Sequence, residues 1–153
     1  MFHSQQALLE AWVQGMEFGV LITVTLFFFF QVKHLVVDFF IQNRFPYMWK
    51  NKGSFFHPGG WLHALSHAVV TFGILWLFAP ASGLIHNYFP WTLIALIICL
   101  TELLAHFLTD LLKVRIAAWY QWGPTTSPKY WDLLGVDQFL HQVFYLFIVL
   151  SWL

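Results

Sequence analysis

Charge is what this sequence has least of. Lysine and arginine number 7 in 153 residues and so do aspartate and glutamate, so charged residues are 9% of the chain, against about 25% in soluble domains. The net charge is zero, which excludes the basic field that nucleic-acid binding requires, so nucleic acid is not expected as a partner. Cys99 is the single cysteine, which also excludes an intrachain disulfide and a cysteine-based zinc site.

Hydrophobic residues, in contrast, make up 59% of the chain. They gather in long runs, and about 20 apolar residues in a helix cross the roughly 30 Å of a bilayer's hydrocarbon core. We therefore predict an all-α membrane protein, one domain over residues 1–153, built as a bundle of four transmembrane helices. The predicted spans are residues 18–42, 61–78, 90–112 and 136–153, the last opened by Asp132 or Gly135.

The segment before the first span has apolar side chains at helical spacing with polar residues between them. We predict a short amphipathic helix over residues 4–17 that lies in the membrane interface. The alternative is that this segment lengthens the first membrane helix.

Basic residues set the expected orientation. The predicted second loop, residues 79–89, contains no lysine or arginine, whereas six lie in or next to the first and third loops: Arg44, Lys50, Lys52, Lys113, Arg115 and Lys129. By the positive-inside rule, the first and third loops are cytoplasmic. We therefore expect the protein in the cell (inner) membrane, surrounded by the lipid bilayer, with both termini on the non-cytoplasmic side.

Each predicted span carries two ionisable residues four positions apart, which is costly inside a membrane unless they are paired or bound. Residues at this spacing share one helix face. In the predicted topology all of them fall at the cytoplasmic ends of their spans, so we expect one polar core at one depth. The pairs are His34 and Asp38, His63 and His67, His106 and Asp110, and Asp137 and His141.

These residue types favour a metal site. Imidazole and carboxylate are ligands of zinc and of first-row redox metals, and helix bundles build such sites from facing helices. Eight candidate ligands exceed what one ion uses, and the three aspartates with Glu102 would balance two divalent cations. We predict two divalent ions, zinc first, with iron or manganese as alternatives. Taken singly, each pair could instead form interhelical hydrogen bonds.

Other polar residues lie near the same depth. Glu102 precedes His106 by one helical turn, which allows a bridging ligand, a hydrogen-bond partner or a catalytic proton acceptor. Four cations could hold a phosphate, although snorkelling to the interface and control of topology are the simpler roles for any one of them. They are Lys33, Arg44, Lys113 and Arg115.

The order of the motifs resembles a known family. The motifs are His34-x-x-x-Asp38-Phe39-x-x-Gln42, Asn51-Lys52-Gly53, His63-x-x-x-His67, His106-x-x-x-Asp110-x-x-Lys113 and Asp137-Gln138-x-x-His141. From about Phe28 to Phe144, this set resembles the small bacterial and phage membrane proteins grouped as domain of unknown function 3307. The resemblance implies the fold and the polar core but no reaction. Within the motifs, Gln42 and Gln138 are expected to hydrogen-bond with the ligands.

We favour a membrane-embedded metal-dependent hydrolase, in which a metal-activated water attacks a lipid or lipid-linked substrate at the interface. Transport or conduction of metal ions or protons is the alternative, but the outer half offers mainly threonines as polar residues. A di-iron acyl oxygenase or desaturase is a further alternative. The sequence lacks the adjacent-histidine clusters of membrane desaturases, which argues against it. A purely structural metal site is the fourth. The tryptophan-rich surface permits a homo-oligomer.

Overall fold

The computed structural model describes residues 2–45, 54–79 and 88–152, and every regular element in these ranges is a helix. The elements are α1 (Phe2–Leu35), the short π-helix η1 (Val36–Ile41), α2 (Gln42–Arg44), α3 (Pro58–Leu77), α4 (Tyr88–Trp119) and α5 (Lys129–Trp152).

Four stretches of the described chain are long and apolar enough to cross a membrane. They are Glu10–Arg44, Pro58–Leu77, Pro90–Trp119 and Lys129–Trp152. The predicted all-α fold with four membrane-spanning helices is therefore confirmed. The motif Asn51-Lys52-Gly53 and the loop residue Lys50 lie outside the described residues, as does most of the predicted second loop.

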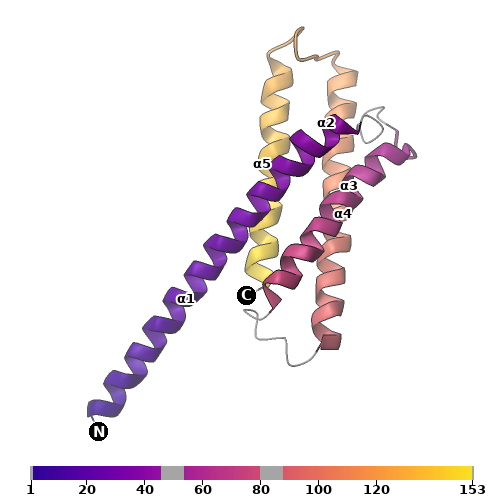
Figure 1. The fold of residues 1–153 in the computed structure, drawn as a ribbon. Coiled ribbons are helices and arrows are strands. Elements are labelled where there is room, and N and C mark those ends of the chain that lie inside the picture. Colours follow the sequence, from indigo (N-terminus) through magenta and orange to yellow (C-terminus); the bar gives the residue numbers. More distant parts are fainter. Residues whose placement is uncertain (1, 46–53, 80–87, 153) are drawn as a thin grey trace.

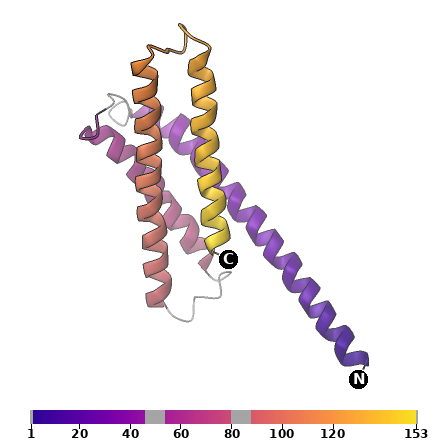
Figure 2. The same ribbon diagram turned by 180° about the vertical axis from the view of Figure 1, so that it is seen from behind.

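The first helix is longer than the predicted span. Residues 4–17 are not a separate element but the beginning of α1, because neither a proline nor adjacent glycines interrupt the helix before Leu35. Figures 1 and 2 show the C-terminal part of α1 crossing the other helices and its N-terminal part extending away from them. Trp12 in this extension is accordingly 65% exposed. Of the two predictions for this segment, the structure matches the one that lengthens the first span.

The ends of α4 and α5 also differ from the predicted ones. α4 continues past residue 112 to Trp119, where Gln121 takes a φ of 57° and the N–H of Trp122 donates to the carbonyl of Ala117 over 2.8 Å. This is the hydrogen bonding of a helix that ends with a residue in the left-handed conformation. α5 begins at Lys129, not at residue 136, because the Ser127 hydroxyl accepts from the Lys129 N–H over 3.3 Å. Neither Asp132 nor Gly135 opens the helix.

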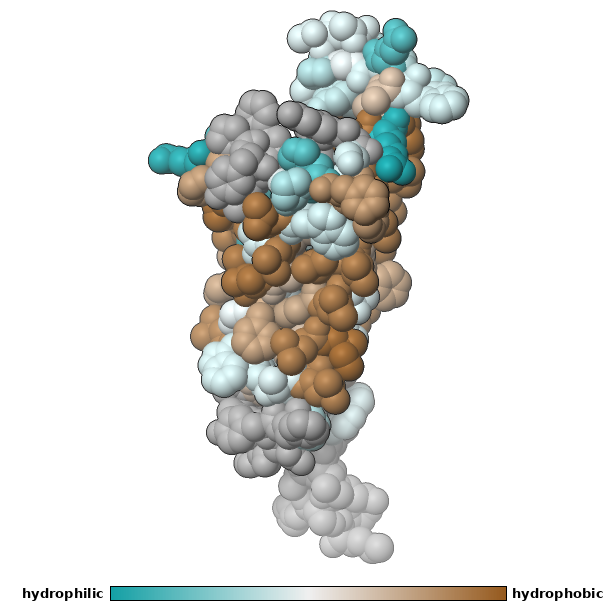
Figure 3. Space-filling model, turned by 90° about the vertical axis from the view of Figure 1, so that its right-hand side faces the viewer, coloured by the Kyte–Doolittle hydropathy of each residue, from teal (hydrophilic) through white to brown (hydrophobic). Residues whose placement is uncertain are grey.

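The core changes character along the bundle. Near the ends of α3 and α5 that lie beside the start of α4 it is apolar, with Trp91, Leu75 and Val149 at 2% exposure or less. Toward the opposite end the core contains the buried polar side chains: Lys33, His34, Asp38, His63, His67, Thr71, Glu102, His106, Asp110, Asp137 and His141. Figure 3 shows an apolar band over the middle of one outer face, with hydrophilic groups beyond it where α4 joins α5.

Gly60 allows α3 to approach α4 closely beside this polar core. A Cβ atom at Gly60 would lie 3.0 Å from Cε2 of Phe107. The Phe107 ring stacks on Trp61 with centroids 4.0 Å apart and meets the edge of Phe55 at 5.3 Å. Because neighbours hold the Phe107 ring on both sides, it has little room to move away from an added methyl group.

We expect Gly60→Ala to lower the free energy of unfolding by about 1–3 kcal/mol through overpacking. Gly73→Ala in the same helix is the matched control, because a Cβ there meets no atom within 4 Å. Thermal unfolding of both variants in detergent, followed by circular dichroism, measures the difference. Equal stability of the two variants would show that α3 and α4 separate at little cost.

Candidate metal centre

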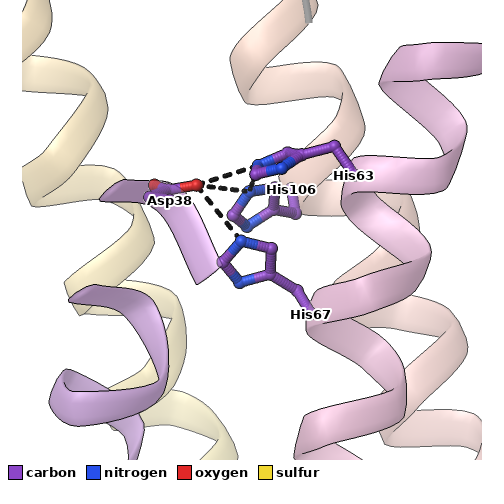
Figure 4. Close-up of side chains that lie close together, drawn as sticks. All are labelled: Asp38, His63, His67 and His106. Atoms are coloured by element: carbon purple, nitrogen blue, oxygen red, sulfur yellow. Dashed lines mark hydrogen bonds and ion pairs between the residues drawn. The ribbon is translucent and has the colours of Figure 1, made fainter. Parts of the chain in front are cut away.

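A π-helical turn positions Asp38 in the polar core. The backbone N–H of Gln42 donates to the carbonyl of Val37, five residues earlier, and the whole segment Val36–Ile41 is π-helical. The regular α-helical spacing assumed from the sequence therefore does not hold here, because the wider turn changes the direction of the following side chains. Such turns occur frequently at functional sites. Figure 4 shows the Asp38 carboxylate directed at histidines from α3 and α4.

Four buried donor atoms converge at this point. Oδ1 of Asp38 lies 2.8 Å from Nε2 of His63, 3.2 Å from Nε2 of His67 and 3.9 Å from Nε2 of His106. The Nε2 atoms of His63 and His106 are 3.1 Å apart. A tetrahedral ion with ligands at about 2.0–2.1 Å holds its ligand atoms roughly 3.3 Å from one another. The four atoms all lie within 4.8 Å of one another, which makes them candidate ligands of a single ion (Figure 4).

The side-chain amide of Gln138 fixes the tautomer of His34. Its Nε2 donates to Oδ2 of Asp137 over 3.1 Å, so its Oε1 is the atom that faces Nε2 of His34, at 2.8 Å. A carbonyl oxygen can only accept a hydrogen bond, so His34 carries a proton on Nε2. The same Nε2 lies 3.2 Å from Oδ2 of Asp38, and Nδ1 of His34 lies 3.0 Å from the Tyr145 hydroxyl. His34 therefore supports the site by hydrogen bonding and lies outside the converging set.

The Tyr145 hydroxyl also reaches His67, whose Nδ1 lies 3.4 Å from it. On the other side of the ring, Nε2 of His67 lies 3.2 Å from Oδ1 of Asp38. A proton on Nδ1 of His67 leaves the Nε2 lone pair facing the carboxylate, where a cation between the two atoms would satisfy both. A histidine ligand that donates through its other ring nitrogen is typical of metal sites, so these contacts are compatible with a metal ligand.

Asp110 connects this set to a second group, which consists of His106, Asp110 and His141. Its Oδ2 lies 3.5 Å from Nε2 of His63 and 3.4 Å from Nε2 of His106. Its Oδ1 lies 3.6 Å from Nε2 of His141. His106 belongs to both groups, but the lone pair of its Nε2 atom can bind only one ion. The second group therefore offers fewer independent ligands than the first.

The ammonium group of Lys113 lies where a second cation would be needed. Its Nζ is 2.6 Å from Oδ2 of Asp137 and 3.5 Å from Oδ1 of Asp110. Lys113 was expected to bind an anion from outside. Instead it neutralises carboxylates that the sequence analysis had assigned to metal.

Lys33 is paired in the same way. It was expected among the anion-binding cations, but it is 3% exposed and forms an ion pair with Glu102. It also donates to the Thr71 hydroxyl over 2.8 Å. This placement corrects its expected role, because a cation buried against a carboxylate is not available to an external phosphate. It also gives Glu102 a structural partner that the sequence had not indicated.

Two of the buried carboxylates in the described core, Glu102 and Asp137, are paired with lysines. The expectation of two ions counted the carboxylates without these two lysines and stays a prediction.

A cavity of about 460 Å³ adjoins the ligand set. Asp38 is part of its wall together with Gln42, Asn43, Lys113 and Gln138. Gln42 thus lies beside the site, as expected, although no hydrogen bond between it and a ligand is seen.

The two expected arginines lie outside the cavity. Arg44 and Arg115 are exposed and do not line it. Asp137 and His141 lie 3.6 Å apart beside Asp110, so all eight predicted ligands meet in one cluster, although four of them converge most closely.

Sequence reasoning missed Tyr145, whose hydroxyl joins His34 to His67. The signal was present, because Tyr145 follows His141 by four residues and therefore lies on the same helix face. The π-helical turn at Asp38 has no comparable signal in the sequence.

Comparison with known protein families matches most of the chain. A family model described as "Protein of unknown function (DUF3307)" matches residues 26–153. The matched region includes every candidate ligand and excludes most of the α1 extension. No curated protein and no solved structure matches the chain.

Proposed function

The chain belongs to the DUF3307 family of proteins of unknown function, and because that family carries no assigned reaction, we propose from the site itself that the protein is a membrane-embedded metal-dependent hydrolase. One divalent ion is held by Asp38, His63, His67 and His106. Zinc is the first candidate, since the four donors are three imidazoles and one carboxylate, and iron or manganese are alternatives.

The observation that carries this proposal is the cavity of about 460 Å³ that has Asp38 in its wall. Structural metal sites are closed by protein ligands, whereas catalytic sites keep a position for water or substrate. A cavity that reaches a ligand supports access of both to the ion. Its polar lining residues Gln42, Asn43 and Gln138 suit a headgroup that forms hydrogen bonds.

The neighbouring residues suit hydrolysis of an ester or a phosphoester. When bound, the ion supplies a Lewis acid that polarises the reacting oxygen and makes water easier to deprotonate. Asp110, whose Oδ2 lies 3.5 Å from His63 and 3.4 Å from His106, accepts the proton of the attacking water. The ester bond breaks as the new bond to water oxygen forms, and the proton passes to the leaving alcohol. The Lys113 ammonium stabilises the negative charge that develops.

Asp110 replaces Glu102 as the proposed proton acceptor. Glu102 was predicted in that role, but its ion pair with Lys33 leaves it serving the packing of α1 against α4. We therefore assign Glu102 to stability, and the variants described in the Discussion separate the two roles.

The alternatives have less support. Transport requires a polar route through the other half of the bundle, where the buried described residues include Leu26, Phe30, Leu75, Ala95 and Val149. A di-iron oxygenase requires a second ion, which the charge of Lys113 disfavours. A closed structural site is disfavoured by the cavity.

We place the polar end of the bundle at the cytoplasmic face of the inner membrane, following the positive-inside rule. The exposed residues Arg44, Arg115 and Lys129 support this choice, since the ends of α2 and α4 and the beginning of α5 lie toward the same end of the bundle (Figure 1). The substrate is then a lipid or lipid-linked molecule whose headgroup lies at that interface.

Removal and return of metal test the proposal. The purified protein, stripped with a chelator, should lose hydrolysis of a lipid ester or lipid phosphate, because no cation remains to polarise the substrate. About one equivalent of zinc, iron or manganese per chain should restore it, because Asp38, His63, His67 and His106 form one set of converging ligands. Elemental analysis gives the stoichiometry, and mass spectrometry of the lipids gives the turnover. Hydrolysis by the metal-free protein would contradict the proposal, and recovery only at two equivalents would favour the dinuclear site.

A further inference from the structure

We propose that the substrate is a bilayer lipid that enters between α4 and α5, with its acyl chain in a crevice there and its polar group in the cavity beside Asp38. The chemistry of this substrate rests on the proposed function. The binding of the lipid can be measured without any turnover.

The crevice lies between α4 and α5 on the outer face of the bundle. Its volume is about 210 Å³. Leu112 and Val136, on opposite walls, are 57% and 56% exposed. In a membrane these side chains contact acyl chains. Its apolar wall consists of Leu108, Leu112, Ile116, Leu133, Val136 and Leu140.

The bottom of the crevice is polar. Lys113 and Asp137 line it, and their ion pair, 2.6 Å long, crosses from α4 to α5. Lys113 also lines the cavity of about 460 Å³ that contains Asp38. The same side chain is therefore shared by an apolar hollow that faces the membrane and a polar hollow that reaches the ligands.

The two hollows lie on opposite sides of the α4 and α5 pair. On the cavity side, the walls are formed by Val114 and Ala117 of α4 and by Leu134 and Gln138 of α5. These residues are close to the crevice residues in sequence, but their side chains lie on a different face of each helix. Lys113 lines both hollows, and its ion-pair partner Asp137 lines the crevice. Rotation of the flexible Lys113 side chain would join them, and an anionic lipid group would replace Asp137 as its partner.

A further hollow continues the crevice toward the middle of the membrane. It has a volume of about 250 Å³ and shares Thr109 and Leu140 with the crevice. The combined groove follows the direction of α4 and α5, which is also the direction of a lipid chain. His106 and His141 line its inner wall.

The apolar crevice and the adjoining polar cavity together fit a lipid better than another helix. A lipid has an apolar chain joined to a polar group, and here an apolar crevice is joined at Lys113 to a polar cavity. An apolar transmembrane helix on the same face would fill the crevice but leave the cavity unused. The occupant that matches both hollows is therefore a single amphiphile.

Photolabelling tests the binding without catalysis. The full chain is placed in phosphatidylcholine nanodiscs that contain a trace of phosphatidic acid with a diazirine next to its glycerol. We expect label on Leu134 and Gln138, on the cavity side of α5. Leu112→Trp and Val136→Trp, which fill the crevice, should lose this label, and Leu100→Trp, at a 59% exposed site elsewhere on α4, should keep it. Label confined to the outer crevice residues, or unchanged in the filled variants, would overturn the proposal.

Rates of hydrolysis then distinguish the proposed lipid site from the proposed hydrolase function on which it rests. Relative to the wild type, the two filled variants should lose at least about tenfold more kcat/KM on long-chain lipids than on short-chain esters. Equal loss on both substrates would overturn the crevice as the chain site. Correct labelling without hydrolysis of either substrate would instead contradict the proposed function and leave the lipid site standing.

Discussion

Asp38→Asn should abolish metal binding and hydrolysis together. Asparagine keeps the shape of the side chain but removes the negative charge that faces three imidazole nitrogens at 2.8, 3.2 and 3.9 Å. We expect the metal content to fall from about one ion per chain to a trace, and kcat/KM to fall by about 10³-fold or more, as the loss of several kcal/mol of transition-state stabilisation implies. Elemental analysis and lipid hydrolysis measure the two effects.

His141→Gln is the matched control for Asp38→Asn. His141 is buried in the same cluster and lies 3.6 Å from Asp110, but it is outside the four converging donors. We expect this variant to keep its ion. Loss of metal from both variants would show that the site extends to His141, and retention of metal in Asp38→Asn would exclude the proposed ligand set. Circular dichroism establishes that both variants are folded.

Glu102→Leu should lower the free energy of unfolding by about 3–5 kcal/mol, because the removal of one partner leaves a buried charge uncompensated. The remaining Lys33 side chain is 3% exposed, and its ammonium lies 4.4 Å from the centre of the Tyr145 ring. Lys33→Met should cost a similar amount. The double variant should lie within about 1 kcal/mol of the wild type, since apolar pairs replace buried ion pairs at little cost.

Unfolding with sodium dodecyl sulfate in mixed micelles measures this double-mutant cycle. The exposed pair of Lys129 and Asp132, 64% and 68% exposed, is the control, and Asp132→Asn should change stability by less than about 0.5 kcal/mol. Additive losses in the cycle would show that Lys33 and Glu102 are not coupled. A double variant that is stable and binds metal but has lost hydrolysis would restore Glu102 as the proton acceptor.

The architecture was readable from the sequence because its signals are local. A run of apolar residues long enough to span the membrane identifies a helix without reference to any other part of the chain. The pairs such as His106 and Asp110 were equally readable, since a spacing of four places two side chains on one face. The boundaries were less certain, and α5 begins earlier than expected because the Ser127 hydroxyl caps it.

Only the tertiary structure decided which polar residues face which. His34 and His67 look equivalent in sequence, but Gln138 and Tyr145 hold His34 by hydrogen bonds, and Nε2 of His67 lies 3.2 Å from Oδ1 of Asp38.

The number of ions depends on contacts of the same kind. From the sequence, Lys33 and Lys113 were expected at the membrane interface. In the structure, Lys33 pairs with Glu102 and Lys113 pairs with Asp137, each across to another helix. The sequence by itself therefore determined a membrane bundle with a polar core of histidine and aspartate, because helix type and helix face are properties of neighbouring residues. The partner of each charge was decided by packing, because the residues that neutralise one another are brought together from helices far apart in the chain.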